Sequence, residues 1–312
     1  MNAEPAVDLS LIILSWNTRD LTLACLGALR RCQAASPMRF EVLVIDNASA
    51  DDSVEAIRRA HPEVRLFRNH ENQGYARGVN QGLRLARGRK VVLLGSDTEV
   101  SPGTLDRMAG FLDENPKVGA VAPRLVNADG SLQRACMRFP DLRTALVYDT
   151  PVEALFPDNR ELRRYFYKDW SHDQSALVDQ PPGTCIMVRR EVLDQVGLMD
   201  RKLWLFFNDV DWCLRMRRRG FEIAYLHEGT EVLHHLGQST KRFPTFPFEW
   251  HKNRLDFFRK HYHAAGAFVV KAAMVYVGIR EVIRIRRRLE KTRDFIAHAS
   301  QVVRALGQVL MR

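Results

Sequence analysis

Several common signatures are missing from this 312-residue sequence. It contains no Gly-x-Gly-x-x-Gly and no Gly-x-x-x-x-Gly-Lys-Ser/Thr, which excludes the simplest dinucleotide-binding loop and the P-loop. Its five cysteines are scattered and form no Cys-x-x-Cys pair, so we expect reduced thiols in a cytosolic protein and no zinc site. Residues 1–10 carry Glu4 and Asp8 but no basic residue, so we expect no signal peptide.

The C-terminal part of the chain has an apolar run too short to span a bilayer. Residues 264–279 are sixteen residues interrupted by Lys271, whereas a spanning helix needs ~20. Residues 264–312 hold ten Lys or Arg against three Asp or Glu, a net +7 of the chain's +10. Apolar residues recur at helical spacing among them, which is typical of a helix on an anionic membrane surface. A helix that pairs with another subunit in a homo-oligomer is the alternative.

The composition otherwise fits a soluble globular protein, with 46% hydrophobic and 27% charged residues. Because the basic charge is confined to an amphipathic tail with few aromatic residues between the charges, we do not expect a nucleic-acid partner.

Apolar runs alternate with helix-like segments through the first half of the chain. We predict strands at 9–14, 40–45, 64–67 and 90–94, and helices at 20–31, 51–60, 76–87 and 102–114. Pro102 is expected in the first turn of the last helix. Strict alternation implies βαβ units, and therefore an α/β fold with a doubly wound, mostly parallel sheet.

The second half is less regular at first. Residues 141–180 are rich in aromatic and charged residues, and we interpret them as an insertion or a flexible segment on the acceptor side. Strands are predicted at 183–189 and 221–225, and helices at 191–197 and 209–219.

Polar residues follow the predicted parallel strands, where open sheets bind their ligands. They are Ser15-Trp16-Asn17, Asp46-Asn47-Ala48-Ser49 and Gly95-Ser96-Asp97. A carboxylate at Asp46 can accept hydrogen bonds from a nucleobase or a ribose hydroxyl; a helix cap or an Asx-turn is the alternative. In the loop at 72–80, glycines allow close approach to a ligand and Arg77 suits a phosphate, although a glycine turn with a solvated arginine explains the same residues.

Two further groups can carry chemistry. Asp97 suits Mg²⁺ or Mn²⁺, which would neutralise a departing diphosphate, and His234 and His235 are candidate metal or phosphate contacts. Phe206 and Phe207 directly precede the segment with Asp209 and Asp211. Apolar neighbours of this kind can shift the pKa of a carboxylate that acts as a base. Because these carboxylates are two residues apart at a predicted helix start, we expect one to be catalytic and the other structural. The alternative is a pair of helix N-terminal acids with Asn208 as the cap.

Seven segments occur in the order typical of one family. They are LIILSWN (11–17), VIDNAS (44–49), NQGYARGVN (72–80), LGSDT (94–98), GTCIMVRR (183–190), FFNDVD (206–211) and HHLGQS (234–239). Over about residues 9–239 the chain resembles the family 2 inverting glycosyltransferases of the GT-A fold, particularly the bacterial rhamnosyltransferase-like branch.

The resemblance implies a role for each motif residue. Asp209 would be the general base, and Asp97 with His234 would hold Mg²⁺ or Mn²⁺. Residues expected to bind the nucleotide-sugar are Ser15, Trp16, Asn17, Asp46, Asn47, Asn72, Gly74, Tyr75, Arg77, Asn80 and Ser96. Residues expected to contact the acceptor or to support the site are Gly183, Asn208, Asp211 and Trp212. A nucleotide-sugar half (about 1–125) and an acceptor half (about 126–262) would form one GT-A domain (1–262), followed by the basic helical tail (263–312).

Two positions depart from the family pattern. Gly95 stands where an Asp or Asn is usual in the metal motif, so coordination would depend on Asp97, phosphate oxygens, water and His234. Asn208 stands where a Glu commonly precedes the base, which should lower the pKa of Asp209 relative to a site that carries the Glu.

The resemblance therefore implies an inverting transferase that is cytoplasmic and peripherally bound to the inner face of the plasma membrane. We expect it to transfer rhamnose from a dTDP donor to a lipid-linked or polysaccharide acceptor. Two alternatives stay open: a UDP-linked donor carrying galactofuranose, GlcNAc or glucose, and a catalytically inactive sugar-nucleotide-binding protein.

Overall fold

The computed structural model describes residues 7–235 and 246–288, together with 304, 307 and 310. It forms two compact units. The first unit comprises Met1–Arg138, Trp170–Trp204 and Asn208–Pro244, and the second comprises Phe139–Asp169, Leu205–Phe207 and Thr245–Arg312. The end of the HHLGQS motif and most of the tail after 288 lie outside the described residues.

The first unit is built on an eight-stranded sheet in the order β3-β2-β1-β4-β9-β6-β10-β8. Its strands are β1 (Leu9–Ser15), β2 (Phe40–Asp46), β3 (Arg65–Arg68), β4 (Lys90–Gly95), β6 (Val118–Pro123), β8 (Ala176–Leu177), β9 (Cys185–Arg189) and β10 (Glu222–Leu226). Neighbours β3-β2-β1-β4 and β6-β10 are parallel, whereas β9 and β8 pair antiparallel. The predicted α/β class with a mostly parallel sheet is confirmed; β6 and β8 were not predicted.

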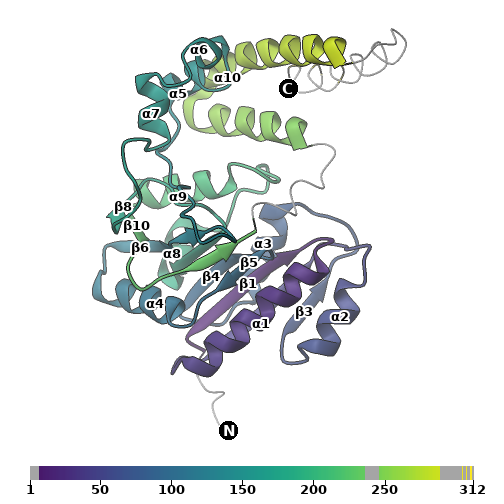
Figure 1. The fold of residues 1–312 in the computed structure, drawn as a ribbon, viewed down its shortest axis with the longest axis vertical. Helices are drawn as coiled ribbons and strands as arrows, with labels where there is room; N and C mark the ends of the chain where they lie inside the picture. The colour runs from purple at the N-terminus through teal and green to yellow at the C-terminus, as the bar shows by residue number, and fades with distance from the viewer. Residues whose placement is uncertain (1–6, 236–245, 289–303, 305–306, 308–309, 311–312) are drawn as a thin grey trace. The chain divides into compact units, whose positions relative to one another are not determined.

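Helices cover this sheet, as the alternating pattern requires. They are α1 (Arg19–Ala35), α2 (Ser53–Ala60), α3 (Tyr75–Leu85), α4 (Thr104–Glu114), α8 (Arg190–Val196) and α9 (Asn208–Arg218). Helix α1 crosses the near face of the sheet in Figure 1. Leu11 and Ile13 of β1 are fully buried in the core, together with Val44 of β2. Burial on both sides explains why these strands read as continuous apolar runs.

The start of α4 differs from the prediction. Pro102 precedes the helix, which begins at Thr104, so its expected place in the first turn is wrong. The cause is Gly103, which adopts φ +84 directly before the helix and breaks the helical backbone.

A second, three-stranded sheet connects distant parts of the first unit. Strand β11 (Val232–His234) lies between β5 (Thr98–Val100) and β7 (Leu125–Val126). In the antiparallel pairing of β11 with β5, His234 lies opposite Thr98. This pairing is what places His234 beside the chain that carries Asp97.

The second unit contains three short helices where we expected irregular chain: α5 (Leu142–Val147), α6 (Pro151–Leu155) and α7 (Arg160–Tyr165). Each begins at a capping residue. Asp141 and Thr144 form a capping box, Thr150 accepts from the backbone of Val152, and Asn159 caps α7. The expectation of an irregular 141–180 segment is therefore wrong for these stretches.

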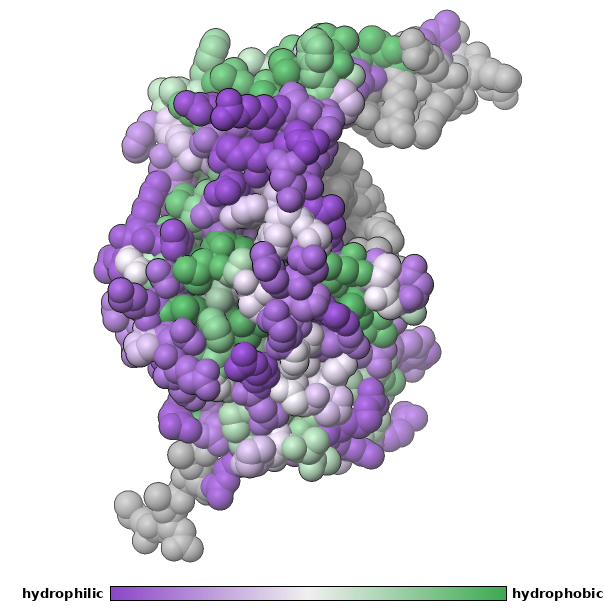
Figure 2. Space-filling view, turned by 60° about the vertical axis from the view of Figure 1, so that its left-hand side comes forward, coloured by the Kyte–Doolittle hydropathy of each residue, from purple (hydrophilic) through white to green (hydrophobic). Residues whose placement is uncertain are grey.

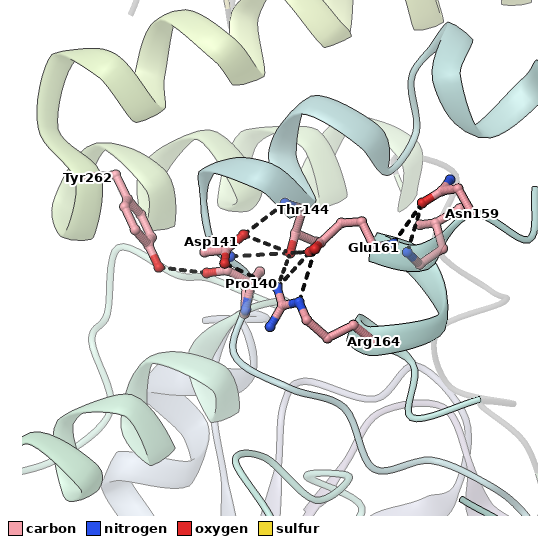
Figure 3. A network of polar contacts seen from close by, with 8 residues as sticks. Pro140, Asp141, Thr144, Asn159, Glu161, Arg164 and Tyr262 are labelled. Carbon is pink, nitrogen blue, oxygen red and sulfur yellow. Dashed lines mark hydrogen bonds and ion pairs between the residues drawn. The ribbon is translucent and has the colours of Figure 1, made fainter. Parts of the chain in front are cut away.

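Polar contacts hold α5 and α7 together (Figure 3). The Thr144 hydroxyl donates to Glu161 over 2.7 Å, and the Arg164 guanidinium donates to Glu161 over 2.6 Å and to Asp141 over 3.1 Å. The Tyr262 hydroxyl, from the C-terminal helix, donates to the Pro140 carbonyl over 2.8 Å. The network therefore connects this segment to the C-terminal helix of the same unit.

That C-terminal helix is α10 (Phe246–Arg288). His263 has φ 54 and ψ −142 and interrupts it, and the chain reverses there in Figure 1. By length and composition alone, the Glu249–Arg280 part of α10 would suffice to cross a membrane, which no other helix among the described residues does.

Candidate active site

Asp46 ends β2 in register with Ser15, which ends β1. One carboxylate oxygen of Asp46, Oδ1, accepts from the Ser49 backbone over 3.0 Å. The other, Oδ2, is buried and finds no hydrogen-bond partner among the described residues. A buried carboxylate oxygen without a donor costs free energy, so this atom is suited to a donor group on a ligand. The predicted turn thus uses Oδ1 of Asp46, and Oδ2 of the same side chain is left for the predicted nucleotide contact.

Asn47 organises the loop that precedes α3. Its amide nitrogen donates to Asn72 Oδ1 over 2.7 Å and to the Gly74 carbonyl over 3.3 Å. Its amide oxygen accepts from Asn69 over 3.1 Å and from the backbone of Gln73 over 3.2 Å. Asn72 Oδ1 also accepts from the Gly74 backbone over 3.0 Å. The polar atoms of Asn47 are therefore committed to the loop, which it positions.

The N-terminus of α3 is closed by Trp204, a residue that the sequence did not single out. The Trp204 carbonyl accepts from the backbone of Tyr75 over 2.7 Å and of Ala76 over 3.4 Å. These amides would otherwise be available to an anion. Gly74 is required here because a Cβ would lie 2.3 Å from Trp204 Nε1.

We predict that Gly74→Ala destabilises the first unit much more than Gly103→Ala does. Both glycines precede a helix at positive φ, +82 and +84, but Gly74 combines it with ψ 171, a region that is essentially glycine-only, whereas Gly103 has ψ −22. Among the described residues, a Cβ at Gly103 meets nothing within 4 Å. Gly103→Ala should therefore cost only the ~1–2 kcal/mol of the left-handed backbone. Gly74→Ala should add ~1–3 kcal/mol for the overlap with Trp204. Urea unfolding of both variants measures the difference, and equal losses would refute the contact.

Buried hydroxyls connect the ends of β1 and β4. Ser15 Oγ lies 3.0 Å from Thr22 Oγ1, and Thr18 Oγ1 lies 3.1 Å from Ser96 Oγ. Asn17, at φ 54, donates its backbone N–H to Ser49 and accepts from the Ala50 backbone through its side chain. These contacts bring the three predicted polar strand ends together at one edge of the sheet.

The predicted metal ligands, Asp97 and His234, lie together and are nearly buried. Asp97 Oδ2 is 3.8 Å from His234 Nε2. Burial lowers the pKa of His234, and the Asp97 carboxylate offsets this only in part, so we expect a neutral imidazole at pH 7. His235 points to a different partner, with Nε2 3.2 Å from Glu99.

Gln133 fixes which nitrogen of His234 carries the proton. The Gln133 amide nitrogen donates to Asn127 Oδ1 over 2.7 Å and to the His234 carbonyl over 2.9 Å. Its amide oxygen therefore faces His234 Nδ1, 2.9 Å away. The neutral imidazole donates from Nδ1 and turns the lone pair of Nε2 toward Asp97. The sequence reasoning missed Gln133, and no local motif marks it.

This arrangement fits a divalent cation. Two electron-rich atoms face each other, and ligands that each lie ~2.1 Å from one ion are at most ~4.2 Å apart. No set of three His, Cys, Asp or Glu side chains in the described part of the chain could hold a metal. The remaining ligands would be diphosphate oxygens and water, as Mg²⁺ tolerates. Gly95 leaves room here, because a Cβ would lie 2.9 Å from Asp97 Oδ1.

Asp209 lies in the first turn of α9, next to the backbone of Gly183 and Val210. Burial raises the pKa of Asp209, opposed by the backbone N–H groups of Val210, Asp209 and Gly183. The residue as a whole is only partly buried. A Cβ on Gly183 would lie 2.7 Å from Asp209 Oδ2, so this glycine leaves space for the carboxylate. The Tyr75 hydroxyl donates to the carbonyl of Gly183 over 3.5 Å. Burial raises the pKa of this hydroxyl, and the charges of Asp209 and Asp97 add to the effect.

Asp211 has a different role. It is fully buried, and its Oδ2 accepts from Arg215 over 2.8 Å. Arg215 in turn donates to the carbonyls of Val196 and Leu198. Trp212 is also fully buried and donates to the Gly197 carbonyl over 2.9 Å. We expected Asp211 and Trp212 either to contact the acceptor or to support the site. Because both are fully buried, the supporting role is the one that remains. Of the pair Asp209 and Asp211, the structure leaves Asp209 as the candidate base.

Four other predicted residues differ in their surroundings. Asn80 is buried, and its amide pairs with both backbone groups of Met199, so it positions the loop after α8 and is not available to a ligand. Asn208 is buried and donates to the Leu203 carbonyl over 3.5 Å. Arg77 is exposed in the first turn of α3, and Trp16 is partly exposed after β1. A ligand contact by Arg77 or Trp16 stays a prediction.

Comparison with known proteins decides the family. The family model described as glycosyl transferase family 2 matches residues 10–197. The chain belongs to this family. It is a glycosyltransferase, and its relatives support the rhamnosyltransferase-like branch. It is 27% identical over 221 residues to the N-acetylglucosaminyl-diphospho-decaprenol L-rhamnosyltransferase of Mycobacterium tuberculosis, covering 67% of this chain and 71% of that protein. It is 22% identical over 252 residues to the dTDP-rhamnosyl transferase RfbF of Shigella flexneri, covering 78% and 75%.

Solved structures share the GT-A fold of this glycosyltransferase. The mannosyltransferase PcManGT of Pyrobaculum calidifontis, in complex with GDP-Man and Mn²⁺, has a TM-score of 0.56 at 16% identity and covers 98% of this chain and 87% of its own. S. aureus TarS 1-349 in complex with UDP has a TM-score of 0.52 at 16% identity and covers 86% and 66%. At these identities the likeness shows the fold.

Proposed function

We propose that this glycosyltransferase moves a sugar from a nucleotide-diphosphate donor to an acceptor hydroxyl in a single inverting displacement. The observation that carries the proposal is that two carboxylates have different surroundings. Asp97 faces the lone pair of a neutral His234, whereas Asp209 is enclosed by Gly183 and backbone amides. Asp97 and His234 are suited to bind a cation, and Asp209 is suited to accept a proton.

On the donor side, the unpartnered Oδ2 of Asp46 would accept from the base or the ribose. Asp97 and His234 would hold Mg²⁺ or Mn²⁺, and the bound cation would neutralise the charge that builds on the departing diphosphate. PcManGT, a neighbour in fold, was solved with Mn²⁺. Arg77 is exposed within the segment 72–80, and we propose it as a phosphate contact.

On the acceptor side, Asp209 removes the proton from the hydroxyl as its oxygen attacks the anomeric carbon. The bond from that carbon to the diphosphate oxygen breaks, and the leaving group takes the electron pair. A raised pKa suits this role because a base whose pKa lies nearer the working pH holds the proton more strongly. Gly183 matters because any side chain at this position would displace the carboxylate.

We propose dTDP-rhamnose as the donor and a lipid-linked acceptor. The support is the names of two relatives, one a rhamnosyltransferase of N-acetylglucosaminyl-diphospho-decaprenol and the other a dTDP-rhamnosyl transferase. A UDP-linked sugar is the second candidate, since TarS binds UDP in a similar fold.

A panel of dTDP-, UDP- and GDP-sugars tests this directly. With Mg²⁺ or Mn²⁺ we expect nucleoside diphosphate release to be fastest from dTDP-rhamnose by at least ~10-fold over other donors, because one missing hydrogen bond in a buried site costs that much or more. Faster release from a UDP-sugar would make that sugar the donor in place of dTDP-rhamnose. Binding without release from any donor would contradict the proposed transfer reaction.

We further propose that the enzyme works at the cytoplasmic face of the membrane, held there by α10 and the basic tail. The support is composition and burial. The kink at His263 divides α10, and Val270, Met274 and Val277 in its second half are buried in the structure, which argues against a spanning helix. Pairing with a second copy is the alternative role for this helix.

A further inference from the structure

The second unit exposes large apolar side chains from two parts of the chain. On the second half of α10, Phe268 is 75% exposed, and Val275, Ile279 and Ile283 are also exposed. Their spacing of seven, four and four residues puts them on one helix face. Around α6, Leu155 is 72% and Phe156 63% exposed, with Val152 at i−3 on the same face of the turn.

These two apolar surfaces lie in one compact unit. Figure 2 shows hydrophobic side chains together along the upper edge of the view, where α6 and α10 lie. Isolated exposed apolar residues are ordinary, but a gathered set on a soluble domain marks an interaction site. We call the exposed residues of α6 and α10 the apolar edge; it comprises Val152, Leu155, Phe156, Phe268, Val275, Ile279 and Ile283.

Asp149 holds the two surfaces together. This residue sits at φ 57 in the turn between α5 and α6. Its Oδ1 lies 3.2 Å from Arg280, and its Oδ2 lies 3.8 Å from His251 and 3.9 Å from Arg254. Arg254 is buried and also donates to the Tyr148 carbonyl over 2.8 Å. Residues from both halves of α10 therefore converge on the turn that leads into α6.

The charge beside the apolar edge indicates what covers it. From residue 280 to 288 the sequence has five arginines and one glutamate. The exposed Arg286 lies three residues after Ile283. Long basic side chains next to an apolar helix face can reach phosphate headgroups while the apolar residues enter the acyl boundary.

We propose that α6 and the second half of α10 form one surface that binds an anionic lipid bilayer, with Leu155 and Phe156 inserted beside Phe268 and Ile279. The inference deepens the proposed function, because it rests on the proposed membrane location and adds a contact outside the tail. The segment around α6, which we had placed on the acceptor side, then anchors the enzyme to the surface that displays a lipid-linked acceptor.

Vesicle sedimentation of the full chain tests the surface without donor or acceptor. Two double variants are compared, Leu155→Ser with Phe156→Ser, and Phe268→Ser with Ile279→Ser. The matched control is Leu177→Ser, a leucine 54% exposed on β8 of the first unit. On vesicles of phosphatidylglycerol and phosphatidylcholine we expect each double variant to bind ~10-fold more weakly and the control to stay within twofold. All three should keep the wild-type melting temperature, because the side chains are exposed.

The outcomes separate this inference from the proposed reaction. Normal vesicle binding by the α6 variant would overturn it, even if the α10 variant lost binding. No binding of wild type to anionic vesicles would overturn it as well. A dimer seen by light scattering and dissociated by the double variants would assign the apolar edge to a second copy of the chain. Nucleoside diphosphate release with a water-soluble acceptor should be unchanged in all of them, so loss of membrane binding leaves the transferase intact.

Discussion

Asp209→Asn should lower kcat by about 10³-fold while donor affinity stays within about twofold of wild type. The asparagine keeps the size of the side chain and can still accept from the Val210 backbone, 2.9 Å from Asp209 Oδ1. It cannot take the acceptor proton, and a positioned general base contributes ~10²–10⁴-fold. Steady-state release of nucleoside diphosphate and calorimetric titration of the donor measure the two quantities.

Asp211→Asn is the matched control, because it makes the same change two residues away on the same helix. Asp211 contacts Arg215, not the pocket of Gly183. We expect this variant to lose thermal stability, since a buried guanidinium–carboxylate contact is broken, and to keep kcat within about tenfold. A larger loss of kcat from Asp211→Asn than from Asp209→Asn would reverse the roles that we give to the two carboxylates.

The raised pKa of Asp209 also predicts opposite effects of pH on activity and stability. The ionised base is needed for turnover, so kcat/KM should rise with pH through a pKa above the ordinary aspartate value. The same group stabilises the fold fully only below its unfolded pKa, and that contribution is lost as pH rises through the folded pKa. Asp209→Asn should therefore raise the melting temperature at neutral pH and leave it unchanged in acid. A lower melting temperature at neutral pH would contradict the burial of the charge.

Asp97→Ala should abolish the metal dependence of the reaction and lower turnover by about 10²–10³-fold. Without this carboxylate the cation would depend on His234 and the substrate, and several kcal/mol of charge neutralisation at the leaving group would be lost. Turnover is measured over a range of Mg²⁺ or Mn²⁺ concentrations, and excess metal should not restore it.

Gln133→Leu separates metal binding from other roles of Asp97. The variant removes the acceptor that holds the proton on His234 Nδ1. Such supporting hydrogen bonds are worth about 10–100-fold in metal affinity. We therefore expect a higher metal requirement with near-normal turnover at saturating metal. An unchanged metal requirement would show that His234 does not bind the cation.

The sequence predicted the donor edge of the sheet better than the contacts within it. Apolar runs fixed β1, β2 and β4, and the polar residues that follow them meet as parallel strands require. Which atoms remain for a ligand depends on neighbours distant in the chain. The Asn80 side chain pairs with Met199, and that of Asn47 binds the loop at Asn72, contacts that form only in the folded chain.

The elements that the sequence analysis missed have two different explanations. Helices α5, α6 and α7 carried readable caps at Asp141, Thr150 and Asn159, but the aromatic and charged composition around them hid the helical period. Gln133 and Trp204 could not be found in this way. Their roles arise from contacts 101 residues away at His234 and across the fold at Gly74, and single-sequence patterns do not encode such pairs.

The anomeric configuration of the product, followed by proton NMR from the first turnover, tests the central claim most directly. Loss of activity in Asp209→Asn would fit either a base or a nucleophile at this position, whereas stereochemistry separates them. A base that deprotonates the acceptor gives one displacement, so we expect a product inverted relative to the donor. Retention of configuration would mean a covalent intermediate and two displacements, and would contradict the role assigned to Asp209.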